Sequence, residues 1–293
     1  MDAPLDPHPP IEAVRRAVRD ALDEDLGGLG DLSAALVPET AHATLSVVPR
    51  RPGVIAGEWC ARESFVQVDP ALKVVWHLGD GARVAPGEVV AEVSGTLRSI
   101  LTAERTALNF LGRLSGIATL TRRYVDAVEA ANPATRVLDT RKTTPGLRVL
   151  EKAAVRAGGG HNHRFGLFDA VLIKDNHLVG LAITEAVTKA RTMWPGRSVE
   201  VECDRIDQVD EACRAGATSV LLDNMSVEQA RACVELVAGL RADGSTLVEV
   251  SGGVTLDDAP RYAAVGVDLI SVGALTHSAP VLDLGLDLAR SPG

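Results

Sequence analysis

The sequence predicts an α/β fold, in which an open α/β barrel follows a smaller domain with an antiparallel sheet. Between Thr44 and Ile100, short β-like runs are broken by Gly, Pro and Asp, which is typical of a compact antiparallel sheet. From residue 136 onward, strand-like runs alternate with helical ones, and this rhythm indicates parallel β/α units. A chain of 293 residues is long enough for two such domains.

The N-terminal part begins with a proline-rich stretch and a helix. Four prolines within the first ten residues predict a loose arm, and residues 11–25 (IEAVRRAVRDALDED) have apolar residues at helical spacing. Gly27, Gly28 and Gly30 are expected to end this helix. The β-like runs that follow are TLSVVP, GVIAG, LKVVWHL and GEVVAEVSG.

A long amphipathic helix is expected within residues 104–130. Its apolar residues recur every three to four positions, at Leu108, Leu111, Leu114, Ile117 and Ala118. We expect this helix to connect the two domains.

Six strand-like runs follow: RVLDT, AVLIK, SVEVECD, TSVLLDN, TLVEVSGG and VDLISVG. Six is fewer than the eight of a regular barrel, so the sequence favours an open or reduced barrel, with a doubly wound sheet as the alternative. Each run ends in polar residues or glycine, and strand carboxyl ends are where such folds build binding sites.

Composition and charge exclude several classes of protein. No run of about 18 apolar residues is long enough to span a bilayer, and the N-terminus MDAPLDPHPP lacks the features of a secretory signal. We therefore expect a cytoplasmic protein with no membrane role. The four cysteines form no CxxC pair, which indicates buried thiols. A net charge of −9 argues against nucleic-acid binding, so any anion site must be local.

Residues 139–177 form a basic segment, with seven Lys or Arg against four acidic residues. Arg148, Lys152 and Arg156 follow helical spacing, which predicts a solvated helix face. The cations Arg141, Lys142, Arg164 and Lys174 instead lie at or next to predicted strand ends. There they would converge on a carboxylate or phosphate. In the Gly-rich GGGHNHR run, His161 and His163 are expected to face a ligand, with metal ligation as a weaker alternative.

Two acidic residues alternate with valine in SVEVECD. This alternation puts Glu200 and Glu202 on the inner face of the barrel, where carboxylates need cations or a metal; an ion pair that only holds the barrel together is the alternative. Asp223 ends a strand one β/α unit later. We expect Glu202 and Asp223 to form one site for hydrated Mg²⁺.

Glycine turns in VEVSGGVT and GVDLISVGA have the form of a barrel phosphate site, in which main-chain N–H groups hold the anion. The sequence therefore predicts a phosphate, a magnesium ion and a small polyanion bound together.

Five segments carry a family resemblance: TAERTALNFLGRLSGIAT (102–119), residues 139–177, VEVE (199–202), LLDN (221–224) and EVSGG (249–253). The chain resembles the quinolinate phosphoribosyltransferases over essentially its whole length. The resemblance implies an open seven-stranded α/β barrel with an N-terminal α/β sandwich domain. It implies a boundary between 1–117 and 118–274, with the tail from about 275 to 293 joining the first domain.

The resemblance also implies the activity and the site. Quinolinate and phosphoribosyl pyrophosphate would give nicotinate mononucleotide, pyrophosphate and CO₂, with Mg²⁺, in a homodimer whose site spans two subunits. Arg105 would be lent by the partner, and Glu202 and Asp223 would lie near the metal. The quinolinate and pyrophosphate cradle would comprise Thr140, Arg141, Lys142, His163, Arg164 and Lys174. The 5-phosphate would be held by Ser251, Gly252, Gly253, Gly273 and His277.

Three alternatives remain open. A paralogue with another acceptor, such as nicotinate, would leave part of the cationic cradle unpaired. A non-catalytic phosphate-sensing module would not need Lys142, Lys174 and Glu202, which are all present. A phosphosugar lyase would use a Schiff-base lysine in an apolar pocket, whereas the candidate lysines lie among charged residues.

Overall fold

The computed structural model describes residues 6–240 and 246–288, and the chain separates into two compact units. The described parts of Met1–Arg122, Thr143–Gly159 and Leu275–Gly293 form the first unit, and Arg123–Lys142 with Gly160–Ala274 form the second. Helix α3 (Leu97–Ala131) begins in the first unit and ends in the second. The sequence-based boundary after residue 117 falls inside this helix. Residues 143–159 belong to the first unit, whereas the sequence predicts them in the barrel domain.

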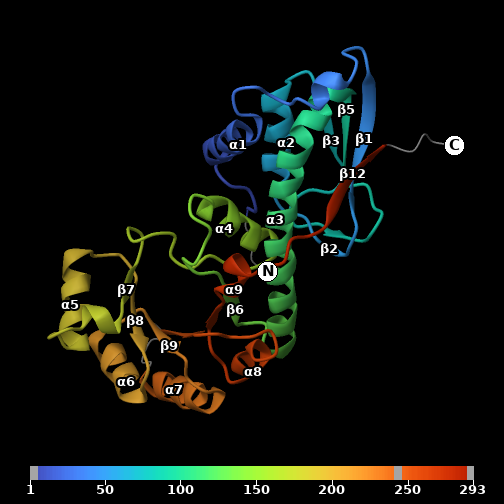
Figure 1. The fold of residues 1–293 in the computed structure, drawn as a ribbon. Helices are drawn as coiled ribbons and strands as arrows, with labels where there is room; N and C mark the ends of the chain where they lie inside the picture. The colour runs from blue at the N-terminus through green and yellow to red at the C-terminus, as the bar shows by residue number, and fades with distance from the viewer. Residues whose placement is uncertain (1–5, 241–245, 289–293) are drawn as a thin grey trace. The chain divides into compact units, whose positions relative to one another are not determined.

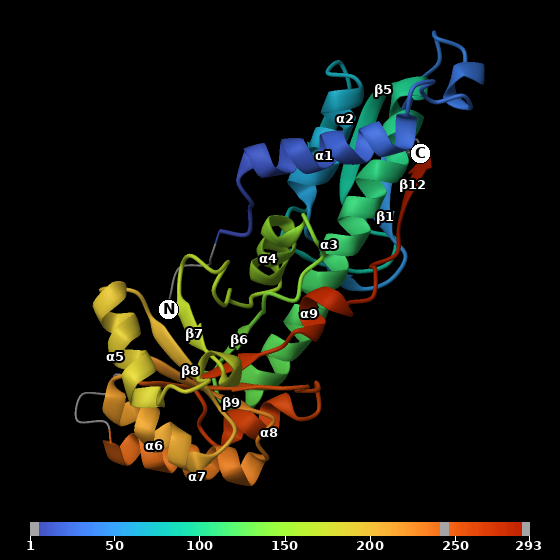
Figure 2. The same ribbon diagram turned by 60° about the vertical axis from the view of Figure 1, so that its left-hand side comes forward.

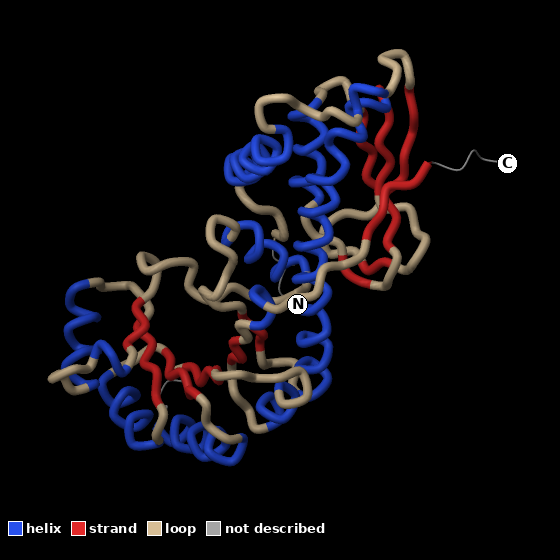
Figure 3. The backbone as a smooth tube through the Cα atoms, in the orientation of Figure 1, coloured by secondary structure: helices blue, strands red, loops and turns tan. Residues whose placement is uncertain are grey.

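The first unit is built on a four-stranded antiparallel sheet with the order β12-β1-β5-β3. Figure 3 shows these strands beside the helices of the same unit. The core between them contains Val47, Val93, Phe65 and Ile100, all at most 2% exposed. The strands are β1 (His42–Pro49), β3 (Lys73–Trp76), β5 (Ala91–Thr96) and β12 (Leu284–Leu288), beside the short pair β2 (Gly53–Val54) and β4 (Arg83–Val84).

Two helices lie at the start of this unit. Helix α1 (Ile11–Leu26) buries Val14, Val18 and Leu22 along one face and stops at Gly27, whose φ is 50°. It packs across helix α2 (Glu58–Val68), as Figure 2 shows. The β-like pattern of residues 44–100 did not predict α2. Its buried residues nevertheless follow helical rather than alternating spacing.

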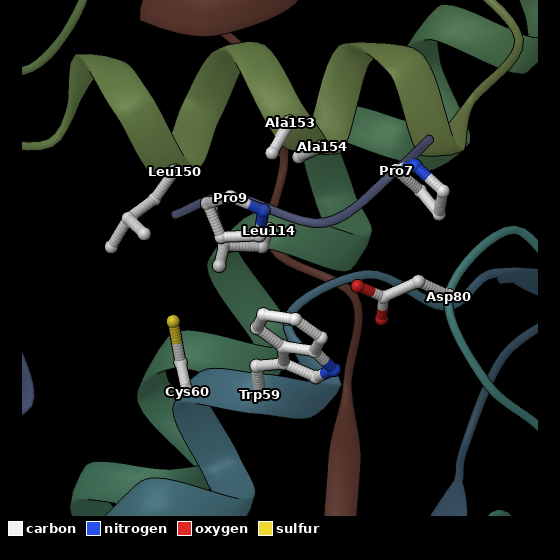
Figure 4. Close-up of a pocket in the computed structure, with 10 residues that line it drawn as sticks. Pro7, Pro9, Trp59, Cys60, Asp80, Leu114, Leu150, Ala153 and Ala154 are labelled. Carbon is white, nitrogen blue, oxygen red and sulfur yellow. The ribbon is translucent and has the colours of Figure 1, made fainter. Parts of the chain in front are cut away.

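The N-terminal arm is packed rather than loose from residue 6 onward, which corrects the prediction for this part; residues 1–5 lie outside the described residues. The His8 ring stacks on Trp59, with the centroids 4.4 Å apart and the planes 8° from parallel. Arg156 of α4 (Arg148–Ala157) donates to the carbonyl oxygens of Asp6 and His8, at 2.6 and 3.0 Å. Figure 4 shows the arm passing between Trp59 and α4, beside a cavity of about 10 Å³.

The second unit contains six parallel strands in the order β6-β11-β10-β9-β8-β7. They correspond to the six strand-like runs of the sequence. An isolated parallel bridge between Leu138 and His161 adds one further position beside β6. The strands are β6 (Arg136–Leu138), β7 (Val171–Ile173), β8 (Val199–Cys203), β9 (Ser219–Asp223), β10 (Leu247–Ser251) and β11 (Leu269–Ser271). The prediction of an open α/β barrel beside an N-terminal domain is confirmed.

Helices cover the outer face of this curved sheet, as Figure 1 shows. They are α5 (Ile183–Met193), α6 (Ile206–Ala215), α7 (Val227–Leu240) and α8 (Ala259–Ala264). On β8, Val199 and Val201 are fully buried, and helices α5 and α6 pack on this strand. Glu200 and Glu202 alternate with these valines and therefore point to the inner face. Within residues 6–240 and 246–288, no helix combines the length and apolar character needed to cross a membrane.

Candidate active site

A cavity of about 330 Å³ opens in the second unit at the carboxyl ends of its parallel strands. Parallel strands bring residues that follow them to one edge, so segments distant in sequence meet here. The cavity is lined by Thr140, Arg141, Lys142, His163, Arg164, Leu172, Lys174, Glu202, Leu221, Asp223, Glu249, Ser251, Gly252 and Ser271.

This lining contains every residue of the predicted site except Arg105, Gly253, Gly273 and His277. Arg105 is exposed on α3 within the first unit. His277 is the last residue of α9 (Ala274–His277), and its Nδ1 lies 2.6 Å from the Ser278 hydroxyl. Gly253 follows Gly252 in the turn after β10, and Gly273 lies two residues beyond β11.

Cations dominate the rim of the cavity. Lys174, immediately after β7, forms an ion pair with Glu202 of β8. Burial lowers the pKa of Arg164, and the nearby charge of Arg141 lowers it further. Two guanidinium groups held close to each other repel, and a bound anion would relieve that repulsion.

Deeper in the cavity, His163 lies between two buried carboxylates. Its Nε2 is 3.0 Å from Oε2 of Glu200 and 3.4 Å from Oε1 of Glu249. Ser219 donates to the other oxygen of Glu200 at 3.1 Å, and Ser271 donates to Glu249. The ligand atoms of these three ionisable side chains lie within 4.8 Å of one another, which would also suit a metal. Hydrogen-bonding distances at Nε2 favour a proton in that position.

The same group of side chains retains a proton at neutral pH. Burial lowers the pKa of His163, but hydrogen bonds to Glu200 and Glu249 outweigh it and raise the pKa above its usual value. Burial and the charge of Glu200 raise the pKa of Glu249. The main-chain N–H of Arg164 donates to Nδ1 of His163 at 2.7 Å, and this bond needs a lone pair on Nδ1. We therefore place a hydrogen on Nε2 of a neutral ring and the further retained proton on the carboxylate pair.

The loop that carries His163 is fixed by a further acid. Asp139, which is fully buried after β6, accepts a hydrogen bond from the His163 main-chain N–H at 3.0 Å. Its second oxygen accepts from the Asn162 side chain at 2.6 Å. The loop is therefore held at the end of β6 by the Asp139 side chain as well as by main-chain hydrogen bonds.

The turn after β10 brings a glycine pair next to Asp223. Ser251 pairs with Asp223 in the parallel register of β10 and β9. Gly252 and Gly253 have φ values of 94° and 64°, a region that favours glycine. A Cβ atom at Gly252 would also clash with the side chain and main chain of Asn224. Position 252 therefore requires glycine for both conformation and space.

Sequence reasoning missed Glu249, Ser271, Leu172 and Leu221 as lining residues. A signal for Glu249 was present, because it alternates with valine in LVEVS as Glu200 and Glu202 do in VEVE. Ser271 and the two leucines carry no such signal, because hydroxyl and aliphatic residues are ordinary inside a barrel.

One prediction for the basic segment is wrong. Lys152, expected on a solvated helix face, is fully buried in α4, while Arg148 and Arg156 are half-buried. Its neighbour Glu151 is also fully buried. The prediction of buried thiols is confirmed for Cys60, Cys203 and Cys233, whereas Cys213 is partly exposed.

Comparisons with known proteins agree with this architecture. Residues 117–287 match the family described as quinolinate phosphoribosyl transferase, C-terminal domain, and residues 31–115 match its N-terminal domain. The nicotinate-nucleotide pyrophosphorylase [carboxylating] of Mycobacterium leprae is 44% identical over 283 residues, covering 95% of this chain and 98% of the relative. The mitochondrial quinolinate phosphoribosyltransferase [decarboxylating] 2b of Nicotiana tabacum is 40% identical, covering 96% and 84%. The nicotinate-nucleotide pyrophosphorylase structure from Francisella tularensis superposes with a TM-score of 0.91 at 39% identity, covering 98% and 100%.

Proposed function

The chain belongs to the quinolinate phosphoribosyltransferase family, and we propose that the cavity of the second unit is where it joins quinolinate to phosphoribosyl pyrophosphate. The products are nicotinate mononucleotide, pyrophosphate and CO₂, in a step of NAD biosynthesis. One observation supports placing the reaction there: Arg141, Arg164 and the Lys174–Glu202 ion pair line the same cavity.

Quinolinate carries two carboxylates on a flat aromatic ring. The guanidinium groups of Arg141 and Arg164 each suit a carboxylate, and their mutual repulsion supports a doubly negative ligand. Leu172 and Leu221 give the same cavity an apolar surface for the ring. Holding both carboxylates would aim the ring nitrogen at the anomeric carbon of the sugar.

Lys142 and Lys174 are the candidates for charge stabilisation on the leaving pyrophosphate. Glu202 and Asp223 line the cavity from adjacent strands. Their carboxylate oxygens are donors that Mg²⁺ prefers, so the residues present fit a hydrated ion. A magnesium ion held there would neutralise charge on the pyrophosphate. The same acids would stabilise the positive charge that grows on the sugar as the bond breaks.

The sugar 5-phosphate would lie at the turn after β10. Ser251, Gly252 and Gly253 offer a hydroxyl and main-chain N–H groups in a conformation open to close approach. Gly273 and His277, in the segment after β11, are proposed as further contacts.

Loss of CO₂ follows from the product of transfer. Once the ring nitrogen is bonded to the sugar it carries a positive charge, and this charge accepts the electron pair left when the adjacent carboxylate departs. The carbon then takes up a proton. No other electron-accepting cofactor is required.

The assay that tests this function supplies quinolinate, phosphoribosyl pyrophosphate and Mg²⁺ and measures mononucleotide and CO₂. Parallel reactions replace quinolinate by nicotinate or omit Mg²⁺. We expect equimolar mononucleotide and CO₂ with quinolinate, and little product in the other two. Product from nicotinate alone would favour a paralogue with another acceptor, and no product from either would reject the proposal.

A homodimer with shared sites is a further part of the proposal, and the cytoplasmic location stays a prediction. Arg105, exposed on α3, is the residue that one subunit would lend to the other. Mixing inactive Arg105→Ala and Lys174→Ala proteins through reversible unfolding should restore up to about a quarter of the wild-type activity if sites are shared. This follows because half the subunits pair as hybrids with one intact site. No recovery in mixtures shown to contain hybrids would contradict sharing.

A further inference from the structure

The imidazole of His163 has both nitrogens engaged by the protein. Nε2 faces the carboxylates of Glu200 and Glu249 at 3.0 and 3.4 Å, and Nδ1 accepts the main-chain N–H of Arg164 at 2.7 Å. A ring in this position has little hydrogen-bonding capacity left for a ligand. The ring is therefore positioned to hold its neighbours, and a direct contact of His163 with substrate stays a prediction.

The two carboxylates depend on the ring in turn. The Glu249 residue is 1% exposed and Glu200 is 6% exposed. Two buried carboxylates are costly unless donors surround them. The serine hydroxyls of residues 219 and 271 supply one donor to each. His163 supplies the donor that the two acids share, so the acids and the ring hold one another in place.

Arg164 is the next residue along this loop. Its guanidinium lines the cavity and donates to the carbonyl oxygen of Ala170 at 3.3 Å. On the other side, Asp139 holds the main chain of His163. The direction in which Arg164 leaves the loop is therefore set by His163, through its ring and its main chain.

We propose that Glu249 is a positioning residue for the acceptor site. Together with Glu200 it holds the His163 ring, and this ring orients Arg164 toward a carboxylate of quinolinate. A guanidinium that is fixed before binding loses less freedom when the ligand arrives. The proposal rests on the proposed placement of quinolinate in this cavity.

Glu249→Gln tests it, because glutamine keeps the size of the side chain but replaces one acceptor oxygen with an amide group that cannot share the proton. We expect the KM for quinolinate to rise about tenfold, with the KM for phosphoribosyl pyrophosphate within about twofold and kcat within about threefold. Arg164→Ala should raise the same KM at least as much. The double variant should be no worse than Arg164→Ala, because Glu249 acts through Arg164. Additive effects, or unchanged quinolinate binding in Glu249→Gln, would overturn the proposal.

Two further variants serve as a fallback and as a control for this experiment. Ser271→Ala removes only the hydroxyl that donates to Glu249, so a smaller rise in the KM for quinolinate is expected. If Glu249→Gln does not fold, folded Ser271→Ala with wild-type kinetics contradicts the proposal. Asp268→Asn is the matched control, since this acid accepts the Val248 N–H at 2.8 Å before β11. It should leave both KM values unchanged, and a rise in the KM for quinolinate there would count against a specific role for Glu249.

The outcomes separate this inference from the proposed function. Unchanged quinolinate binding in Arg164→Ala would mean that the cavity does not hold quinolinate as proposed. A raised KM in Arg164→Ala together with wild-type kinetics in Glu249→Gln would reject only the positioning role.

Discussion

Two buried glutamates, one in each unit, have opposite surroundings. Glu151 of α4 is fully buried and accepts hydrogen bonds from the Arg113 guanidinium at 2.8 Å and from the main chain and hydroxyl of Thr144 at 3.0 and 2.7 Å. Glu249 of β10 is equally buried but shares one histidine with a second carboxylate. The first acid is saturated with donors inside the first unit. The second is left short of positive charge at the wall of a cavity, as expected of a functional site.

The largest effect should come from Glu151. Replacing it with alanine leaves the Arg113 guanidinium without its buried partner, and breaking such a pair costs about 3–5 kcal/mol. We expect the free energy of unfolding in urea to fall by about that amount. A loss below about 1 kcal/mol would show that the hydrogen-bonded Glu151 contributes little to the stability of the first unit.

Lys174 tests the functional role of the cavity in the second unit, beside which Glu249 lies. Lys174→Ala should lower kcat by roughly 100- to 1,000-fold, the usual cost of removing one group that stabilises transition-state charge. Its side chain is 40% exposed, so the unfolding free energy should change little. Lys142→Ala is expected to act in the same direction. Wild-type kcat in a folded Lys174→Ala protein would exclude Lys174 from the chemical step.

The arginines should affect binding more than turnover. In Arg141→Ala or Arg164→Ala, the KM for quinolinate is expected to rise about 10- to 100-fold, because each change removes a charge-assisted hydrogen bond worth about 1.5–3 kcal/mol. Arg214→Ala is the control, since this residue pairs with Asp210 on the exposed face of α6. Steady-state kinetics with unchanged quinolinate binding in both cavity variants would contradict their role.

The smallest effect concerns another acid, Asp80 of the first unit, whose side chain is 3% exposed. Burial raises its pKa to about 6, although the main-chain N–H groups of Glu58 and Gly57 oppose the shift. The folded state therefore binds more protons than the unfolded state between the ordinary pKa of 3.8 and about 6. The contribution of Asp80 to stability is lost as the pH rises through that window.

Asp80→Asn should remove this contribution. Urea unfolding of both proteins between pH 4 and 7 would show it as a difference in slope, with the variant gaining stability relative to the wild type as the pH rises. Parallel curves would mean that Asp80 titrates as an exposed carboxylate does.

The alternation of residues made the barrel predictable. Apolar runs that end in polar residues are recognisable as buried strands. The two-residue alternation of side chains along a strand was enough to place Glu200 and Glu202 on the inner face. The extra position at His161 is a single bridge, too short to leave a pattern. The helical spacing in α2 extends over only 11 residues among β-like runs, which is too short to stand out from them.

The burial of Lys152 could not be inferred in the same way. Charged residues at helical spacing look alike whether the helix face meets water or other charged groups, and the distinction depends on tertiary partners. Four lining residues of the cavity, Arg141, Lys142, Arg164 and Lys174, were predictable because these cations lie at predicted strand ends rather than at helical spacing. The lining was missed where the residue type is common in cores, at Leu172, Leu221 and Ser271.

The stacking of His8 on Trp59 makes the N-terminal arm observable by fluorescence. The chain has three tryptophans, Trp59, Trp76 and Trp194, so replacing the other two with phenylalanine leaves Trp59 as the single indole emitter. The imidazole lies in face-to-face contact with this indole at 4.4 Å, so its departure changes the surroundings of the emitter. The intensity of Trp59 therefore reports whether the arm is seated against α4, and it does so in the folded enzyme without an added label.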